Sequence, residues 1–254
     1  MNELIEYKNF SKVLAQASAD VIKQYFRTGI SVESKADNSP VTIADKKAEE
    51  VMRELIIKHY PDDGIFGEEF GETNKDAEYT WILDPIDGTK SFICGAYSFG
   101  TLIGLLKNGK PILGIYNHPI FNDFLIGDNS ETRINEQKTL IRNCNVLNEA
   151  ILLTTDHLNI EKYQNIIKFN HLINRVKLYR NWGDCYGYYL LATGYADIMI
   201  DPIMSPWDLL PLIPIIKGAG GVITDYQGND PIKGKSAVAS SSQIHSTVIS
   251  ILNN

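Results

Sequence analysis

Residues 81–92 read Trp-Ile-Leu-Asp-Pro-Ile-Asp-Gly-Thr-Lys-Ser-Phe, and this stretch indicates both local structure and chemistry. Its apolar start predicts a buried strand, which ends where the proline bends the chain. Asp84 and Asp87 flank that bend, so both carboxylates can face one cation. Gly88 and Thr89 then offer backbone N–H groups at a helix start, where phosphate groups bind in proteins. The stretch therefore predicts a metal site beside a phosphate site.

Two alternatives to this metal site are an EF-hand and a surface turn that caps a helix. An EF-hand needs Asp-x-Asp-x-Asp-Gly followed by a glutamate, and the spacing between Asp84 and Asp87 does not match it. An acidic surface turn that merely caps a helix remains open on these residues alone.

The composition argues against several classes of protein. The chain has 254 residues, a formal net charge of −7 and an apolar fraction of 44%. Nucleic acids and anionic membranes require clustered lysine and arginine, so we expect neither as a partner. Cys94, Cys144 and Cys185 are odd in number and lack CxxC spacing, which indicates neither a disulfide framework nor a zinc site. A reduced, cytoplasmic setting fits these cysteines best. The N-terminus lacks a signal-peptide pattern, and no apolar run approaches about 18 residues, so we expect no membrane span.

Helices and strands alternate along the chain without a linker. Apolar residues at helical spacing predict a helix over the first 26 or so residues, and a second helix after Asp45. Two apolar runs on either side of Lys107–Lys110 predict a β-hairpin. We expect an α+β part over residues 1–127 that carries most metal ligands. An α/β part over residues 128–254 would complete the site within one structural unit.

Three further carboxylates stand where elements begin or bend. Asp45 follows Thr42 as Thr-x-x-Asp before the second helix. Glu68 lies in a bend between glycines, where packing gives no reason for a glutamate. Asp208 follows Pro206 at the start of an apolar helix. A capping role is open for Asp45 and for Asp208.

An all-oxygen ligand set indicates a hard cation. Glu68, Asp84, Asp87 and Asp208 suit Mg²⁺ or Mn²⁺ better than zinc or copper. A pair of such ions supports phosphoryl chemistry with little covalent help from the protein. Asp45 and Thr89 could orient the attacking water.

Four motifs in order resemble the inositol monophosphatase family of metal-dependent phosphatases over nearly the whole chain. The resemblance implies a layered α-β-α-β-α sandwich of the sugar-phosphatase type, a homodimer, a small phosphorylated substrate and sensitivity to lithium. The motifs are Val41–Asp45, Gly67–Glu69, Asp84–Thr89, and Pro206–Asp208 with Gly218–Gly221.

The resemblance also implies a ligand set. One Mg²⁺ would be held by Glu68, Asp84 and the backbone carbonyl of Ile86. The second would be held by Asp84, Asp87 and Asp208. A third, weaker ion would involve Glu68, and Mn²⁺ could substitute for Mg²⁺.

Further roles follow from the same resemblance. Asp45, Glu68 and Thr89 would act in catalysis, and the Gly88 and Thr89 amides would take the phosphate. Lys35 falls where the family has a lysine on a mobile loop near the site. The residues implied to contact substrate are Ile86, Asp87, Gly88, Thr89, Gly183, Asp184, Asp201 and Asp208.

The substrate is indicated by the second half of the chain. Gly183–Tyr186 resembles the Gly-Asp-Cys-Tyr segment of histidinol-phosphate phosphatases within this family. Asp184 and Asp201 would be acidic partners for the ammonium and imidazole groups of such a substrate. A helix N-cap is the alternative for Asp184, and related enzymes generally have a glutamate at the position of Asp201.

Two other functions remain open on the sequence. Carboxylates also accept hydrogen bonds from hydroxyl groups, so an inositol monophosphatase or a broad sugar-phosphate or nucleotide phosphatase is the enzymatic alternative. A non-catalytic partner of the transcription machinery is the alternative from another class. We expect the enzyme, because a complete ligand set has no use in a purely structural protein.

Overall fold

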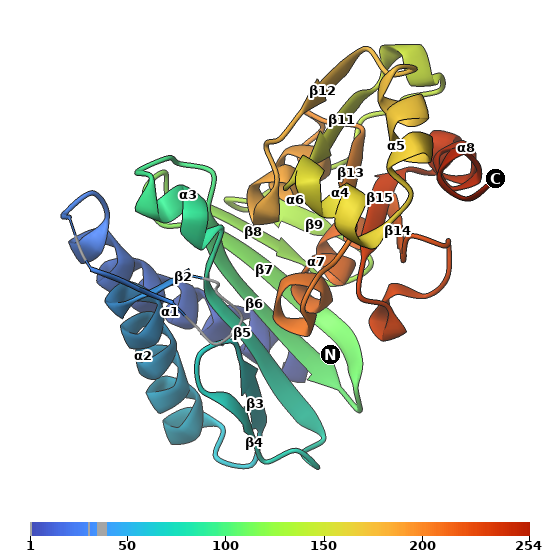
Figure 1. The fold of residues 1–254 in the computed structure, drawn as a ribbon. Coiled ribbons are helices and arrows are strands. Elements are labelled where there is room, and N and C mark those ends of the chain that lie inside the picture. The colour runs from blue at the N-terminus through green and yellow to red at the C-terminus, as the bar shows by residue number, and fades with distance from the viewer. Residues whose placement is uncertain (1, 30, 35–39) are drawn as a thin grey trace.

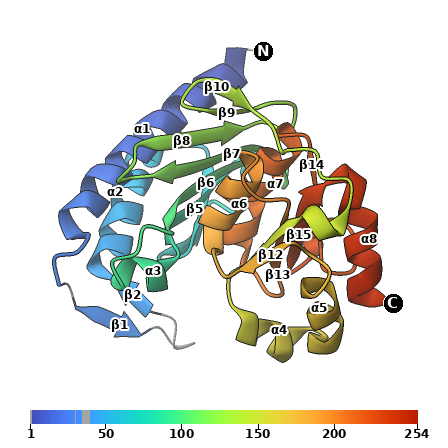
Figure 2. The same ribbon diagram turned by 90° about the horizontal axis from the view of Figure 1, so that it is seen from above.

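The computed structural model describes residues 2–29, 31–34 and 40–254, and Lys35 lies outside them. Helices and sheets alternate in five layers, which confirms the predicted α-β-α-β-α sandwich (Figures 1 and 2). Two 3₁₀ turns, Leu147–Glu149 and Pro231–Lys233, lie in connections. The helices are α1 (Asn2–Tyr25), α2 (Ile43–His59), α3 (Thr89–Ile93), α4 (His157–Tyr163), α5 (Ile166–Ile173), α6 (Asp184–Ala192), α7 (Pro206–Gly218) and α8 (Ser242–Asn253).

The first large sheet has eight strands and is antiparallel except between β3 and β5. The predicted hairpin is confirmed, because β6 and β7 pair antiparallel. Asn108 and Gly109 both take positive φ in its turn. In spatial order the strands are β10 (Gln137–Thr139), β9 (Thr132–Ile134), β8 (Asp123–Gly127), β7 (Lys110–His118), β6 (Gly100–Lys107), β5 (Tyr79–Asp87), β3 (Gly64–Gly67) and β4 (Gly71–Thr73).

The second large sheet has five strands, and β11 runs parallel to both of its neighbours. A separate two-stranded sheet joins β1 (Val32–Ser34) to β2 (Pro40–Thr42) before α2. The strands of the second sheet, in spatial order, are β12 (Leu178–Arg180), β11 (Ile151–Thr154), β13 (Ile198–Asp201), β15 (Ala237–Ser241) and β14 (Gly221–Thr224).

The division between residues 127 and 128 stays a prediction. Strands β9 and β10 lie beyond residue 127 and still extend the eight-stranded sheet. The second sheet begins with β11 at Ile151. Residues 128–150 therefore contribute two strands to the first sheet before the second sheet begins.

Apolar side chains bury each layer against the next. Helices α1 and α2 cover the outer face of the eight-stranded sheet, where Leu14, Met52 and Trp81 are fully buried. Helices α6 and α7 fill the space between the two sheets, and α5 and α8 cover the far face of the second sheet. None of the helices in the described part of the chain combines the length and apolar character that a bilayer span requires.

Helix α7 touches the eight-stranded sheet with its backbone. A Cβ at Gly114 of β7 would lie 1.8 Å from the carbonyl oxygen of Pro211. Pro211 and Pro214 both lie inside the helix, and the carbonyl of Pro214 accepts a hydrogen bond from the Asn129 amide at 3.2 Å. The glycine thus lets α7, which carries Asp208, lie directly on the strands.

Replacing Gly114 by alanine tests this contact, because no flexible side chain can yield there. We expect G114A to lower the free energy of unfolding by about 3 kcal/mol, measured by urea denaturation. G104A is the matched control on β6, where the added Cβ would meet Ile82 and Pro211 side-chain atoms at 3.2 Å. Equal stability losses for the two variants would contradict the account of how α7 packs.

Candidate metal centre

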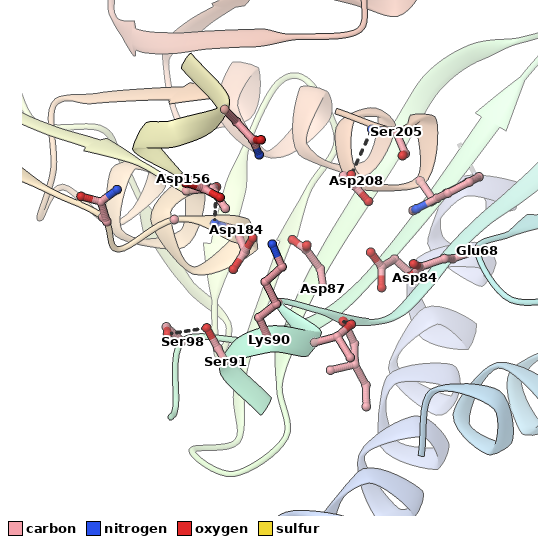
Figure 3. A pocket seen from close by; sticks show the side chains of 18 residues that line it. Glu68, Asp84, Asp87, Lys90, Ser91, Ser98, Asp156, Asp184, Ser205 and Asp208 are labelled. Carbon is pink, nitrogen blue, oxygen red and sulfur yellow. Dashed lines mark hydrogen bonds between the residues drawn. The ribbon is translucent and has the colours of Figure 1, made fainter. Parts of the chain in front are cut away.

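A bulge at the end of β5 brings two carboxylates to one side of the sheet. Residues three apart in a regular strand point to opposite faces. Here the pairing of β5 with β6 shifts between Asp84, opposite Leu102, and Asp87, opposite Gly100. The extra residue in β5 changes the alternation, and both side chains face the same cavity (Figure 3).

Asp208 completes a cluster with these two aspartates. It projects from the first turn of α7, and oxygens of the three carboxylates lie within 4.8 Å of one another. Asp84 is 2% exposed, and its Oδ1 has no hydrogen-bond partner among the described residues. An orphaned, buried carboxylate oxygen beside two more carboxylates fits a divalent cation of the Mg²⁺ type.

Glu68 lies on the same cavity. It follows β3, in the turn toward β4, and Figure 3 shows it next to Asp84. The backbone N–H of Glu68 donates to the carbonyl of Leu83 on β5 at 3.0 Å. The turn that carries Glu68 is thereby tied to the strand that carries Asp84.

Burial and the repulsion of neighbouring carboxylates disfavour the charged forms of Asp84 and Asp208. Burial raises the pKa of Asp84 well above its ordinary value, and the charges of Glu68 and Asp87 raise it further. Burial likewise raises the pKa of Asp208 to about 7, with a contribution from Glu68. Such pKa values indicate a site that gains from a bound cation.

Asp45 faces Thr89 at the edge of this cluster. The Thr89 hydroxyl lies 3.4 Å from Asp45 Oδ1 and 3.0 Å from the carbonyl oxygen of Ile86. Asp45 is 1% exposed, and burial raises its pKa to about 6, although hydrogen bonds from Thr42 oppose the shift.

Capping is confirmed for both helix-start aspartates. Asp45 Oδ2 accepts the backbone N–H of Thr42 at 2.8 Å, and Asp208 Oδ2 accepts that of Ser205 at 3.0 Å. Each aspartate is the third residue of its helix. The cap holds one carboxylate oxygen and leaves the other to face Thr89 or the aspartate cluster.

Helix α6 begins against Asp87. The backbone N–H of Cys185 donates to Asp87 Oδ2 at 2.6 Å. The N-cap alternative for Asp184 is wrong, because Gly183 is the N-cap and Asp184 is the first helical residue. Asp184 takes a φ of 48°, which is strained for this residue, and its N–H donates to Thr155 Oγ1 at 2.8 Å. Its side chain faces the cavity (Figure 3).

Asp201 lies on a smaller space of about 70 Å³ that adjoins the main cavity and shares Asp87, Asp184 and Asp208 with it. It is 4% exposed. Its Oδ1 accepts the Thr155 N–H at 3.2 Å, and its Oδ2 accepts the Tyr188 hydroxyl at 3.0 Å. Both oxygens therefore already have protein partners, and a contact of Asp201 with substrate stays a prediction.

The main cavity has a volume of about 710 Å³ and gathers most of the predicted residues. Those that line it are Glu68, Asp84, Ile86, Asp87, Gly88, Thr89, Gly183, Asp184 and Asp208. Sequence reasoning did not assign Lys90, Ser91, Ser98, Thr155, Asp156, Asn159, Asn181, Ser205 and Trp207 to the site. A capping signal before α4 was available for Asp156, but it could not show which way the side chain points.

The charge of the cavity is unbalanced. Its described lining contains one lysine, Lys90, which Figure 3 shows between Asp87 and Asp184. Burial raises the pKa of Asp184 well above its ordinary value, and the charge of Lys90 only partly opposes that shift. The six acidic residues in the lining are Glu68, Asp84, Asp87, Asp156, Asp184 and Asp208.

Comparison with known proteins relates this arrangement to phosphatases. The profile of the Inositol monophosphatase family matches residues 3–254. The bifunctional phosphatase IMPL2, chloroplastic, of Arabidopsis thaliana is 45% identical over 89% of this chain, which spans 66% of that protein. A histidinol-phosphatase of Chlorobaculum parvum is 36% identical, over 95% of this chain and 94% of that one.

A solved structure of an inositol monophosphatase from Zymomonas mobilis superposes with a TM-score of 0.85. Its sequence is 36% identical, and the match covers 96% of each chain.

The raised pKa of Asp208 predicts how Mg²⁺ stabilises the protein. Between about pH 4 and pH 7, Asp208 is protonated more fully in the folded, metal-free protein than in the unfolded chain. The stability that this protonation contributes is therefore lost as the pH rises through about 7. Mg²⁺ competes with those protons. We expect a fixed Mg²⁺ concentration to raise the Tm more at about pH 8 than at about pH 5.5. An equal rise at both pH values, measured by calorimetry, would contradict this electrostatic account.

Proposed function

Because the chain belongs to the inositol monophosphatase family and is a phosphatase, we propose that it hydrolyses histidinol phosphate to histidinol and phosphate. The observation that most supports this substrate is that Asp156 and Asp184 line the cavity beyond the three clustered aspartates and form its acidic side. The 36% identical histidinol-phosphatase supports the same substrate.

The proposal includes two Mg²⁺ ions per chain. Glu68, Asp84 and the carbonyl of Ile86 would hold one, and Asp84, Asp87 and Asp208 would hold the other. Bound Mg²⁺ supplies a Lewis acid for the phosphoryl oxygens and lowers the pKa of a water molecule. The orphaned oxygen of Asp84 supports this assignment. Substitution by Mn²⁺ and a third, weaker ion at Glu68 stay predictions.

The protein's own groups would orient the reactants. Asp45 Oδ1 and Thr89 Oγ1 lie 3.4 Å apart, so one water could hydrogen-bond to both and pass a proton to the carboxylate. Gly88 has a φ of 90° and directly precedes Thr89, the first residue of α3. A Cβ at Gly88 would lie 2.9 Å from the carbonyl oxygen of Ser98, so glycine is required for this turn. The backbone amides of Gly88 and Thr89 would receive the phosphate.

The organic part of the substrate would lie on the opposite side of the cavity from Glu68. Asp156 and Asp184 lie there, across Asp87 from Asp84 (Figure 3). Histidinol phosphate carries an ammonium and an imidazole, and carboxylates favour such cations over neutral hydroxyl groups. Asn159, on the same cavity, could accept or donate a hydrogen bond.

Inositol phosphate is the second candidate substrate. The similarity to the Zymomonas inositol monophosphatase supports it, and the same carboxylates could accept hydrogen bonds from hydroxyls. A homodimer, a cytoplasmic location and lithium sensitivity stay predictions, and a role with the transcription machinery stays the untested alternative.

The substrate proposal is tested by phosphate release at saturating Mg²⁺. We expect kcat/KM for histidinol phosphate to exceed that for inositol 1-phosphate by about 100-fold, which is about 2.7 kcal/mol of transition-state discrimination. A flat profile, or a preference for inositol 1-phosphate, would leave the phosphatase chemistry intact and reject this substrate.

The acidic side is tested by Asp156→Asn. Asparagine is as good an N-cap as aspartate, so the bond from the Leu158 N–H, 2.9 Å long, can persist while the charge is lost. We expect about a tenfold loss of kcat/KM for histidinol phosphate, largely through KM, and no change for inositol 1-phosphate. Glu161→Gln is the matched control, because Glu161 is exposed on α4 and away from the cavity. Equal losses of kcat/KM for the two substrates would show that Asp156 does not recognise the positive charge of histidinol phosphate.

A further inference from the structure

Glu49 is a fully buried acid that lies outside the proposed ligand set. It is 0% exposed and follows Asp45 by one turn of α2. Its Oε1 accepts the Nε–H of Arg53 at 2.7 Å. The two oxygens also receive backbone N–H groups from another element: Oε2 from Glu69 at 2.8 Å, and Oε1 from Phe70 at 3.2 Å.

Those two amides belong to the turn that presents Glu68. The turn runs from Gly67, the last residue of β3, to Gly71, the first residue of β4, and it approaches Glu49 of α2 closely. A Cβ at Gly67 would lie 2.0 Å from Glu49 Oε1, so the carboxylate can reach the turn only because this residue is a glycine. Arg53 donates to the carbonyl of Gly71 at the other end of the turn.

The turn is thus held from two directions. On one side, the backbone N–H of Glu68 is bonded to Leu83, next to Asp84 on β5. On the other, Glu49 and Arg53 bind the turn to α2. The helix that carries Asp45 therefore also sets the position of Glu68 relative to Asp84.

Stability alone does not explain a buried ion pair at this place. Replacing such a pair by apolar residues is often neutral or stabilising, because desolvating two charges costs several kcal/mol. An acceptor for two turn amides, however, cannot be replaced by an apolar side chain without leaving those amides unsatisfied.

We propose that Glu49 is a positioning residue, which holds the turn at residues 67–71 so that Glu68 reaches the metal beside Asp84. This inference rests on the proposed metal site. Groups one step removed from a metal commonly change its affinity by about 10- to 100-fold when they are lost.

The test uses the metal alone as the probe. Glu49→Gln keeps the side-chain size but turns one acceptor oxygen into an NH₂ group. We expect Mg²⁺ affinity, measured by titration calorimetry on the full chain, to fall by at least about tenfold. We also expect faster hydrogen exchange at the amides of Glu69 and Phe70.

Asp197→Asn is the matched control for lost stability. Asp197 is also 0% exposed and paired with an arginine, Arg142, and its Oδ2 accepts a backbone N–H, from Ile151, at 2.6 Å. It does not line the cavity. We expect D197N to lower the Tm while leaving Mg²⁺ affinity within about twofold.

A second variant tests the position of the turn without removing a charge, and it replaces E49Q in the test if E49Q does not fold. Gly67→Ala keeps every ionisable group but places a Cβ where the Glu49 carboxylate lies. We expect weakened Mg²⁺ binding here also. Wild-type affinity in E49Q or in G67A, or an equal loss in D197N, would overturn the positioning role. A wild-type protein that binds no Mg²⁺ would instead reject the metal site itself.

Discussion

Asp84, Asp87 and Asp208 hold their oxygens within 4.8 Å of one another in a largely buried place, and this repulsive arrangement has to be maintained by the rest of the structure. Each aspartate comes from a rigid element. The bulge in β5 orients two of them, and α7 lies close enough to bring the third, because Gly114 admits its backbone. A site that is costly when empty is one that gains most from a divalent cation.

Two helices use the same local device at the edge of this cluster. In both α2 and α7 the third residue is an aspartate, and its carboxylate accepts the N–H of the capping residue. The cap fixes the side chain, so capping and chemistry are joint roles of one carboxylate. Asp87 is fixed differently, by the first turn of α6. The cavity is therefore lined by side chains whose positions are largely determined before any ligand binds.

The four motifs predicted the sandwich through the family that they resemble, and the placing of Asp84, Asp87 and Asp208 at turns and helix starts predicted the carboxylate cluster. Residues brought in by tertiary structure were not predictable in that way. Asp156 reaches the cavity from the loop that follows β11. For Asp201, which the sequence did indicate, the motif could not show that Thr155 and Tyr188 already bind both of its oxygens. Glu49, with Arg53 four residues later, resembles an ordinary surface pair on a helix until the turn at residues 67–71 is seen against it.

Diffraction from crystals soaked in Mn²⁺ can show whether these carboxylates form a metal centre. Anomalous scattering locates manganese without reference to catalysis. We expect one peak about 2.2 Å from oxygens of Asp84, Asp87 and Asp208, and a second beside Glu68 and Asp84. A map with no manganese at the end of β5, or with manganese bound only elsewhere, would contradict this assignment.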